Sequence, residues 1–368
     1  MKHKVCFFNQ SSVHYRKNIF VLMDKELGVD FYFGDSRKQG AIKELDVSCL
    51  KNFKGYFHNI GKGALYWQNG AIKLLWSDYT DLITTGTHYC LSAWLIILLA
   101  PLFHKKIYLW SHGAYGDEKG LKKILAKWKM NHVEASFLYG NYAKNVLRKW
   151  GVDESKLHVF YNSLDYDRQL EIRKNLYSSR IYKKHFENNN INLFFIGRMM
   201  PIKKLDMIIN AMKLLQERNI EVNLTFIGDG QEKTKLISLV DEYGLNKQVW
   251  FYGSCYDEVK IAELIYNADI CISPGDVGLT AIHSMVFGTP VISHNNFKKQ
   301  MPEFEAIHEG KTGSFFTEGD ITSLADCIQR WLSAEHDRKS IREKCYEIID
   351  EYYNPHKQID IVKKVIFK

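Results

Sequence analysis

The architecture can be inferred first from one stretch, Ser273-Pro-Gly-Asp-Val-Gly-Leu-Thr-Ala-Ile-His-Ser-Met-Val-Phe-Gly-Thr-Pro290. It follows the short apolar run 268–273, which is typical of a buried parallel strand. Pro274 and Gly275 end that strand, and from Gly278 onward the apolar residues recur at helical spacing. A strand, a turn and a helix that begins at 278–280 leave backbone N–H groups unpaired at one point, which suits a phosphate. Because any doubly wound α/β domain has such turns, the phosphate assignment depends on other parts of the chain.

A second strand, turn and helix lie upstream, in residues 192–206. Arg198 and Lys203 follow the carboxyl end of that strand, the edge at which open α/β sheets hold ligands. A guanidinium that can grip two phosphate oxygens and a mobile ammonium together match a diphosphate. The alternative is an ordinary solvated helix start, since Lys and Arg are mostly exposed.

Five short motifs follow one another in the second half: Gly197-Arg198-x4-Lys203, Phe226-Ile-Gly-Asp-Gly230, Val249-Trp-Phe-Tyr-Gly253, Gly278-Leu-Thr280 and Gly288-Thr-Pro-Val-Ile292. In order and spacing they resemble the retaining glycosyltransferases of family 4 (glycosyl transferases group 1), of the bacterial surface-polysaccharide type and the GT-B fold. The resemblance implies that Arg198 and Lys203 are catalytic residues that hold the donor's diphosphate. The donor-binding residues that it implies are Gly197, Gly230, Tyr252, Gly253, Asp276, Gly278, Leu279, Thr280 and His283.

The chain departs from the family at one important point. The family usually has two glutamates eight positions apart, one near the donor sugar and one on the ribose hydroxyls. Here those positions hold Gly275 and His283. Asp276 is one residue from the first position and could replace that glutamate. His283 could hydrogen bond a ribose hydroxyl through a ring nitrogen, or it could be a packed helix residue.

The first half reads as a second α/β domain. The expected strands are Val5–Asn9, 29–33, 65–68, 81–84, 107–110, 136–139 and 157–161. They alternate with helical segments, of which the first is Lys17–Leu27, and this is the pattern of a parallel sheet with crossover helices. The resemblance therefore implies an α/β GT-B fold, in which two Rossmann-like parallel-sheet domains face each other across a cleft.

Two places in the first half could contact substrate. His14, Tyr15 and Arg16 follow the first strand and could contact the acceptor or a donor phosphate, or could belong to a surface loop that caps the next helix. His112 follows the strand 107–110 and lies between glycines that would let a ligand approach the backbone. A lone histidine is usually structural, but the matching histidine touches the transferred sugar in several family members, so the resemblance makes His112 a catalytic candidate.

The expected domains are an N-terminal acceptor-side domain over 1–165, a linker over 166–190 and a donor domain over 191–350. The last segment, 351–368, is expected to pack back on the N-terminal domain, as in similar proteins. At 368 residues and 46% apolar content, the chain is long enough for two full cores.

The net charge and the cysteine content limit which binding partners and which cellular compartment we expect. A formal net charge of +8 fits nucleic acid, an anionic membrane or phosphorylated small molecules. No RNA-binding signature or basic arm is present, so we expect no nucleic-acid partner. Seven cysteines without a close pair argue against zinc and disulfides and for a reducing compartment. The amino terminus has no signal-peptide core, which predicts a cytoplasmic protein.

Two segments bear on membrane contact. The apolar run 91–103 is too short to span a bilayer, and we expect a buried crossover helix rather than membrane docking. The lysines at 122, 123, 127 and 129 could meet anionic lipid as a peripheral contact, or could form a solvated helix face.

The expected reaction is transfer of a sugar from a nucleotide-diphosphate donor to a hydroxyl of a glycan or lipid-linked oligosaccharide, in capsule, O-antigen or exopolysaccharide assembly. The resemblance implies retention of configuration with no cofactor and no metal; an inverting enzyme would need a base such as His112 or Asp117. Asp165 and Asp167 form a carboxylate pair, but they lie in an expected connection, so a metal role is disfavoured. The alternatives are a nucleotide-sugar epimerase, or a non-catalytic nucleotide- or sugar-binding subunit of the same fold.

Overall fold

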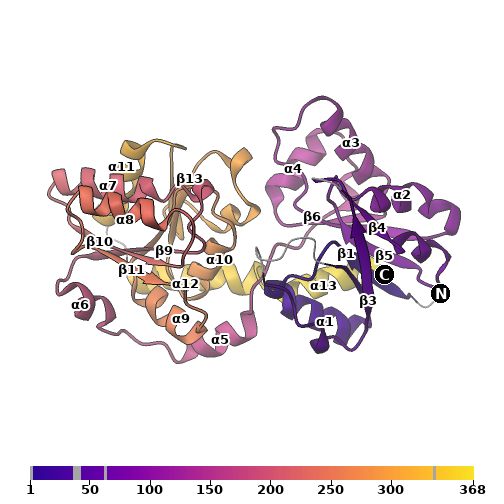
Figure 1. Ribbon diagram of the computed structural model, residues 1–368, viewed down its shortest axis with the longest axis horizontal. Helices are drawn as coiled ribbons and strands as arrows, with labels where there is room; N and C mark the ends of the chain where they lie inside the picture. Colours follow the sequence, from indigo (N-terminus) through magenta and orange to yellow (C-terminus); the bar gives the residue numbers. More distant parts are fainter. Residues whose placement is uncertain (1–2, 36–42, 62–63, 335–336) are drawn as a thin grey trace. The chain divides into compact units, whose positions relative to one another are not determined.

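The computed structural model describes residues 3–35, 43–61, 64–334 and 337–368. The chain forms two compact units, unit 1 (Met1–Asp165 and Tyr352–Lys368) and unit 2 (Tyr166–Glu351) (Figure 1). Residues 166–190, expected as a linker, lie within unit 2 and include the helices α5 (Tyr166–Lys174) and α6 (Ile181–Phe186).

Unit 1 is built on an eight-stranded sheet in the order β4-β3-β2-β1-β5-β6-β7-β8. Its strands are β1 (Val5–Asn9), β2 (Asp30–Gly34), β3 (Phe53–Ile60), β4 (Trp67–Asn69), β5 (Asp81–Thr85), β6 (Lys106–Ser111), β7 (Ala135–Leu138) and β8 (Leu157–Val159). Neighbouring strands are parallel except β3 and β4, which pair antiparallel.

Helices cover both faces of the unit 1 sheet. They are α1 (Lys17–Leu27), α2 (Leu91–Leu99), α3 (Gly120–Asn131), α4 (Asn141–Lys149) and α13 (Pro355–Ile366). Along β1, Val5 and Phe7 pack with α1 and α13, whereas Cys6 and Phe8 pack in the cluster that contains residues of α2, α3 and α4. This alternation follows from the two-residue period of a strand, and it gives unit 1 a core on each side of the sheet.

The region before β5 differs from the expected parallel pattern. β3 was not anticipated, because exposed residues alternate with half-buried or buried ones along much of it, and the strand expected at 65–68 is the short antiparallel β4. The parallel pattern expected for this half holds from β3 to β8, but it does not extend to β4 at this edge. A strand that pairs by a hairpin needs no crossover helix, so the strand–helix alternation carries no signal for it.

Unit 2 has a six-stranded, wholly parallel sheet in the order β11-β10-β9-β12-β13-β14. Its strands are β9 (Ile191–Ile196), β10 (Val222–Ile227), β11 (Val249–Gly253), β12 (Ile270–Ser273), β13 (Val291–His294) and β14 (Gly313–Phe316). The chain order reverses between β9 and β12, and such a switch point is where open α/β sheets bind ligands.

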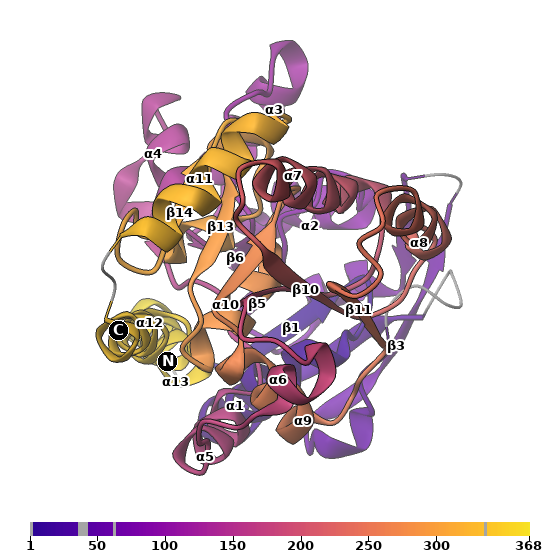
Figure 2. The same ribbon diagram turned by 90° about the vertical axis from the view of Figure 1, so that its left-hand side faces the viewer.

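The remaining helices of unit 2 are α7 (Asp206–Glu217), α8 (Lys233–Glu242), α9 (Glu258–Asn267), α10 (Gly278–Val286), α11 (Ile321–Ser333) and α12 (Arg338–Tyr352). Figure 2 shows α7, α8 and α11 on one side of this sheet and α5 and α9 on the other. Both units are therefore three-layered α/β structures with a parallel core sheet. Among the described residues, no helix is both long and apolar enough to cross a bilayer.

Candidate functional site

The switch point of unit 2 gathers several of the predicted donor-binding residues. Gly197 follows β9, and α10 begins at Gly278 shortly after β12 ends. The Thr280 hydroxyl donates to the carbonyl oxygen of Ile196 at 3.0 Å, which ties the first turn of α10 to the end of β9. The start of α10, with Gly278, Leu279 and Thr280 half-buried, thus lies beside the loop that carries Arg198. Since the first N–H groups of a helix have no partner within it, this edge suits an anion.

Lys203 and Asp276 form an ion pair at the same edge. The Lys203 ammonium donates to the Asp276 carboxylate at 2.8 Å and to the Asp276 backbone carbonyl at 2.7 Å. Both side chains are largely covered, at 20% and 17% exposure, so solvent screens this ion pair less than it screens a pair on the surface. One residue predicted to hold the diphosphate and one predicted to face the donor sugar therefore meet directly.

Steric crowding explains why residue 275 is a glycine. Its N–H donates to the Lys203 carbonyl at 3.1 Å, and a Cβ built there would lie 2.0 Å from the carbonyl oxygen of Ile202. The 3₁₀ helix Pro201–Lys203 thus packs directly on the turn after β12. The glutamate that the resembled family has at this position could not be accommodated in this arrangement.

The glycine loops of unit 2 pack closely as well. A Cβ at Gly230 would lie 2.3 Å from the Met199 carbonyl oxygen, and one at Gly228 would lie 2.0 Å from the Gly197 carbonyl oxygen. The loop after β10 therefore supports the Arg198 loop. Arg198 itself is exposed.

Two predicted donor-binding residues lie farther out. Tyr252 and Gly253 are on β11, the edge strand, which is two strand spacings or about 10 Å from β9. The Tyr252 ring packs on Trp250 with centroids 5.0 Å apart, and the Gly253 carbonyl accepts from the N–H of Gly228 at 2.9 Å. The structure gives Gly253 a supporting role under the loop after β10, and it does not bring Tyr252 to the Lys203–Asp276 pair.

His283 hydrogen bonds to a residue that the sequence analysis did not single out. Its Nε2 lies 2.9 Å from Oε1 of Glu258, the first residue of α9, and the Gln169 amide donates to the same oxygen at 2.7 Å. Burial raises the pKa of the Glu258 carboxyl, but His283 and Gln169 more than offset that effect and hold it at about 2. Glu258 thus places a carboxylate behind the position of the family's second glutamate. The sequence feature that could have identified Glu258 is an acidic residue at the start of the helix that follows the 249–253 motif.

Unit 1 holds a second polar cluster, which brings together Arg16 and His112. The Arg16 guanidinium donates to the Tyr139 hydroxyl at 2.6 Å, and the indole N–H of Trp110 donates to the same oxygen. The His112 ring packs against Tyr139 with centroids 4.8 Å apart. Burial, and then the nearby charge of Arg16, lowers the pKa of His112 to about 4, so its imidazole is neutral at pH 7.

Two buried nitrogens in this cluster lack a partner. Within the described part of the chain, Nδ1 of His112 and Nε of Arg16 are covered and make no hydrogen bond. Buried polar atoms are nearly always paired, so unpaired atoms at the carboxyl edge of a parallel sheet point to a ligand. His14 is exposed, and its ring nitrogen hydrogen bonds to the Lys43 carbonyl oxygen at 3.0 Å rather than to this cluster. The Tyr15 ring contacts His14 at 5.9 Å and lies within 5.8 Å of the Arg16 guanidinium.

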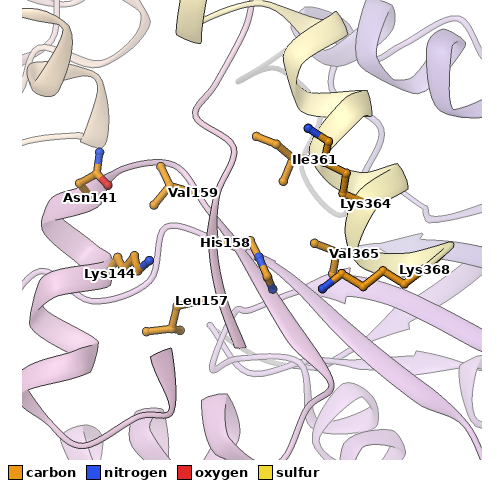
Figure 3. A pocket seen from close by; sticks show the side chains of 9 residues that line it. All are labelled: Asn141, Lys144, Leu157, His158, Val159, Ile361, Lys364, Val365 and Lys368. Carbon is orange, nitrogen blue, oxygen red and sulfur yellow. The ribbon is translucent and has the colours of Figure 1, made fainter. Parts of the chain in front are cut away.

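A separate pocket of about 700 Å³ lies in unit 1, and none of the predicted site residues lines it. Figure 3 shows its lining side chains, from α4 (Asn141, Lys144), β8 (Leu157, His158, Val159) and the C-terminal segment (Ile361, Lys364, Val365, Lys368). The charged side chains of this lining are the lysines Lys144, Lys364 and Lys368. Within the described ranges, no three His, Cys, Asp or Glu side chains gather so as to hold a metal ion. Asp165 instead accepts a hydrogen bond from the Asn18 amide.

The amino-acid sequence is similar to a known family and to several characterised proteins. Residues 179–348, which lie within unit 2, match the family described as Glycosyl transferases group 1. The poly(ribitol-phosphate) alpha-N-acetylglucosaminyltransferase of Staphylococcus aureus (strain COL) is 24% identical over 174 residues, which are 46% of this chain and 34% of that protein. The chain thus spans about a third of the length of that relative. The alpha-D-kanosaminyltransferase of Streptomyces kanamyceticus is 23% identical over 321 residues, 80% of this chain and 79% of that protein.

A solved structure covers nearly the whole chain. The Anabaena protein Alr3699/HepE, in complex with UDP, superposes with a TM-score of 0.74 at 16% identity, over 98% of this chain and 99% of that one. At this identity the likeness defines the fold, which is GT-B, and the predicted fold class is confirmed. Unit 2 therefore contains the region that matches this family, and the chain as a whole has a GT-B scaffold.

Proposed function

We propose that this chain transfers a sugar from a nucleotide-diphosphate donor to a hydroxyl of a glycan or lipid-linked oligosaccharide, with retention of configuration. The observation that carries the proposal is the convergence of Lys203, Asp276 and the start of α10 at the switch point of unit 2. It is supported by the family match over 179–348 and by two relatives that are named as sugar transferases.

The proposed donor is a UDP-sugar, because the structural neighbour Alr3699/HepE is solved with UDP. The diphosphate would lie at the start of α10, where the helix dipole and the first N–H groups favour an anion. Lys203 and Arg198 would supply the cationic side chains. Lys203 has three N–H donors and uses two on Asp276, so one remains for a phosphate oxygen.

The chemical step breaks the bond between the anomeric carbon and the diphosphate oxygen. The acceptor oxygen bonds to that carbon, and the acceptor's hydroxyl proton passes to the leaving phosphate. Negative charge grows on the diphosphate as the bond breaks, and preorganised cations and N–H groups stabilise it. Removal of one such group typically lowers the rate by roughly 10²- to 10³-fold. This scheme uses no metal ion.

Asp276 has two roles in the proposal. It holds the Lys203 ammonium in position before the donor arrives, and its other carboxylate oxygen is available to a hydroxyl of the donor sugar. In the same scheme His283, fixed by Glu258, offers a polar contact for the ribose.

His112 and Arg16 are the proposed sugar- and acceptor-facing groups of unit 1. A neutral imidazole can donate from one nitrogen and accept at the other, which suits sugar hydroxyls. The proposed setting is the assembly of a bacterial surface polysaccharide such as a capsule, O-antigen or exopolysaccharide, at the cytoplasmic face of a membrane. A lipid-linked acceptor would require unit 1 to reach that surface.

The test is a thermal-shift panel of UDP, GDP, ADP, CMP and dTDP, with Lys203→Met and the exposed Lys247→Met as a matched pair. A ligand at 100 times its Kd adds about 2.7 kcal/mol to the free energy of unfolding. We expect a shift with UDP that is lost in Lys203→Met and kept in Lys247→Met. An equal UDP shift in both variants would remove Lys203 from the donor site.

A further inference from the structure

Helix α2 has an outer apolar face that the rest of the described chain covers only in part. Ala93, Ile96 and Ile97 are buried in the unit 1 core. On the other side, Leu91, Trp94, Leu95 and Leu98 recur at i, i+3, i+4 and i+7, and Leu91 and Leu98 are exposed. The expectation of a buried crossover helix therefore holds for one face only. A helix that is apolar all round is ordinarily buried all round, so the outer face of α2 requires an explanation.

Helix α3 carries a matching stripe. Leu121, Ile124, Leu125 and Trp128 have the same helical spacing, and the first three are exposed. Lys122, Lys123 and Lys127 flank the stripe and are exposed as well. Lys129 was expected to lie with these lysines on a lipid-facing or solvated helix face. It is buried instead, and its ammonium donates to the carbonyl oxygens of Gly86 and Thr87.

The two stripes adjoin each other. The Trp94 and Trp128 rings stack with centroids 5.9 Å apart, and both helices cover the same side of the sheet (Figure 1). The surface continues past α2, where Leu102 is exposed and Trp76 contacts Phe103 edge-on at 4.8 Å. We call this surface the α2–α3 face; its large exposed residues are Trp76, Leu91, Leu98, Leu102, Leu121, Ile124 and Leu125, each between 40% and 75% exposed.

The size and charge of the α2–α3 face fit a lipid bilayer. Seven such side chains present roughly several hundred Å² of apolar surface, comparable to the largest patches on soluble monomers, which are often functional. Neither α2 nor α3 contains an acidic residue, whereas α3 has three exposed lysines. Apolar side chains bordered by lysines and tryptophans are typical of elements that lie in a membrane interface, where lysines meet lipid phosphates.

We propose that the α2–α3 face docks on an anionic lipid bilayer, with its leucines and Ile124 in the interface and Lys122, Lys123 and Lys127 against lipid phosphates. For its biological meaning the inference rests on the proposed function, since it would bring unit 1 to the membrane that holds a lipid-linked acceptor. Binding to vesicles needs neither donor nor acceptor. Its failure can therefore be told apart from failure of the transferase proposal, which the nucleotide-induced thermal shift tests separately.

The experiment is co-sedimentation of the full chain with vesicles of phosphatidylcholine alone or with 30% phosphatidylglycerol, at about 0.1 M and 0.5 M NaCl. We expect binding to the anionic vesicles that weakens at high salt, because the Debye length falls from about 10 Å to a few Å. Lys122→Gln/Lys123→Gln should weaken partitioning by about fivefold for each lysine removed. Leu121→Ser/Ile124→Ser should weaken it at least about tenfold.

The controls are Lys213→Gln/Lys247→Gln and Ile237→Ser, which remove lysines and an exposed apolar side chain from unit 2. They should bind vesicles as the unmodified chain does. Equal thermal unfolding midpoints and equal circular dichroism spectra, both measured without nucleotide, would show that each variant is folded. No binding to anionic vesicles, or binding that neither α3 variant weakens, would overturn the proposal. A dimer in sedimentation velocity that Leu121→Ser/Ile124→Ser dissociates would overturn it in favour of a second copy of the chain.

Discussion

The buried imidazole of His112 should make the stability of unit 1 depend on pH. The pKa of this side chain lies at about 4 in the folded chain and near 6.5 when exposed. Between these values the unfolded chain binds more protons than the folded one, so the free energy of unfolding falls as the pH falls from 6.5 to 4 and levels off below. The difference of the two pKa values corresponds to about 3 kcal/mol.

The assay compares the unmodified chain with His112→Gln, which keeps a polar side chain but does not titrate. Urea unfolding is followed between pH 7.5 and 4.5 by tryptophan fluorescence, which mainly reports unit 1 because only Trp250 and Trp331 of the eight tryptophans lie in unit 2. The stability advantage of the unmodified chain should shrink by about 2–3 kcal/mol over this range. Other titrating groups cancel in the comparison because both proteins share them.

Parallel pH profiles for the two proteins would refute the reasoning. They would mean that His112 keeps its ordinary pKa and hence is neither desolvated nor close to the Arg16 charge. The proposed neutral contact of His112 with a sugar hydroxyl would then lose its physical basis.

Three further predictions concern unit 2. Arg198→Ala should lower donor turnover at least about 100-fold while Lys247→Ala leaves it unchanged, as measured by release of the nucleotide diphosphate; turnover like that of the unmodified chain would remove Arg198 from the site. Gly275→Glu, which installs the residue usual in the resembled family, should destabilise unit 2 by about 2–4 kcal/mol in thermal unfolding, because its Cβ would clash with the Ile202 carbonyl; an unchanged midpoint would show that this turn is looser than described. EDTA should leave turnover unchanged, and a loss restored by Mg²⁺ or Mn²⁺ would contradict the metal-free scheme.

Patterns of neighbouring residues predicted individual strands, helices and turns. The strand Val5–Asn9, the helix Lys17–Leu27 and the turn between 273 and 278 follow from apolar spacing and from glycine and proline punctuation. The donor edge could be placed because carboxyl ends of parallel strands share one side of a sheet. The β3–β4 hairpin could not be placed in this way, because it has no crossover helix between its strands.

The contacts that define the site are long-range and could not be read from spacing. Lys203 pairs with Asp276 across 73 positions, and Glu258 reaches His283 across 25. Such pairs depend on how strands order themselves in the sheet. In the same way, the apolar composition of α2 does not reveal that half of it faces outward, since the same residues would fill a helix that is buried on both sides.

The measurement that tests the central claim most directly is release of UDP from a panel of UDP-sugars by the purified chain, with and without a glycan or lipid-linked acceptor. The account predicts release from one or a few donors, stimulated by acceptor, abolished in Lys203→Met and retained in Lys247→Met. UDP binding without release from any donor, whatever the acceptor, would contradict it and would favour a non-catalytic nucleotide-binding subunit. Conversion of the donor sugar to its epimer without release would favour an epimerase.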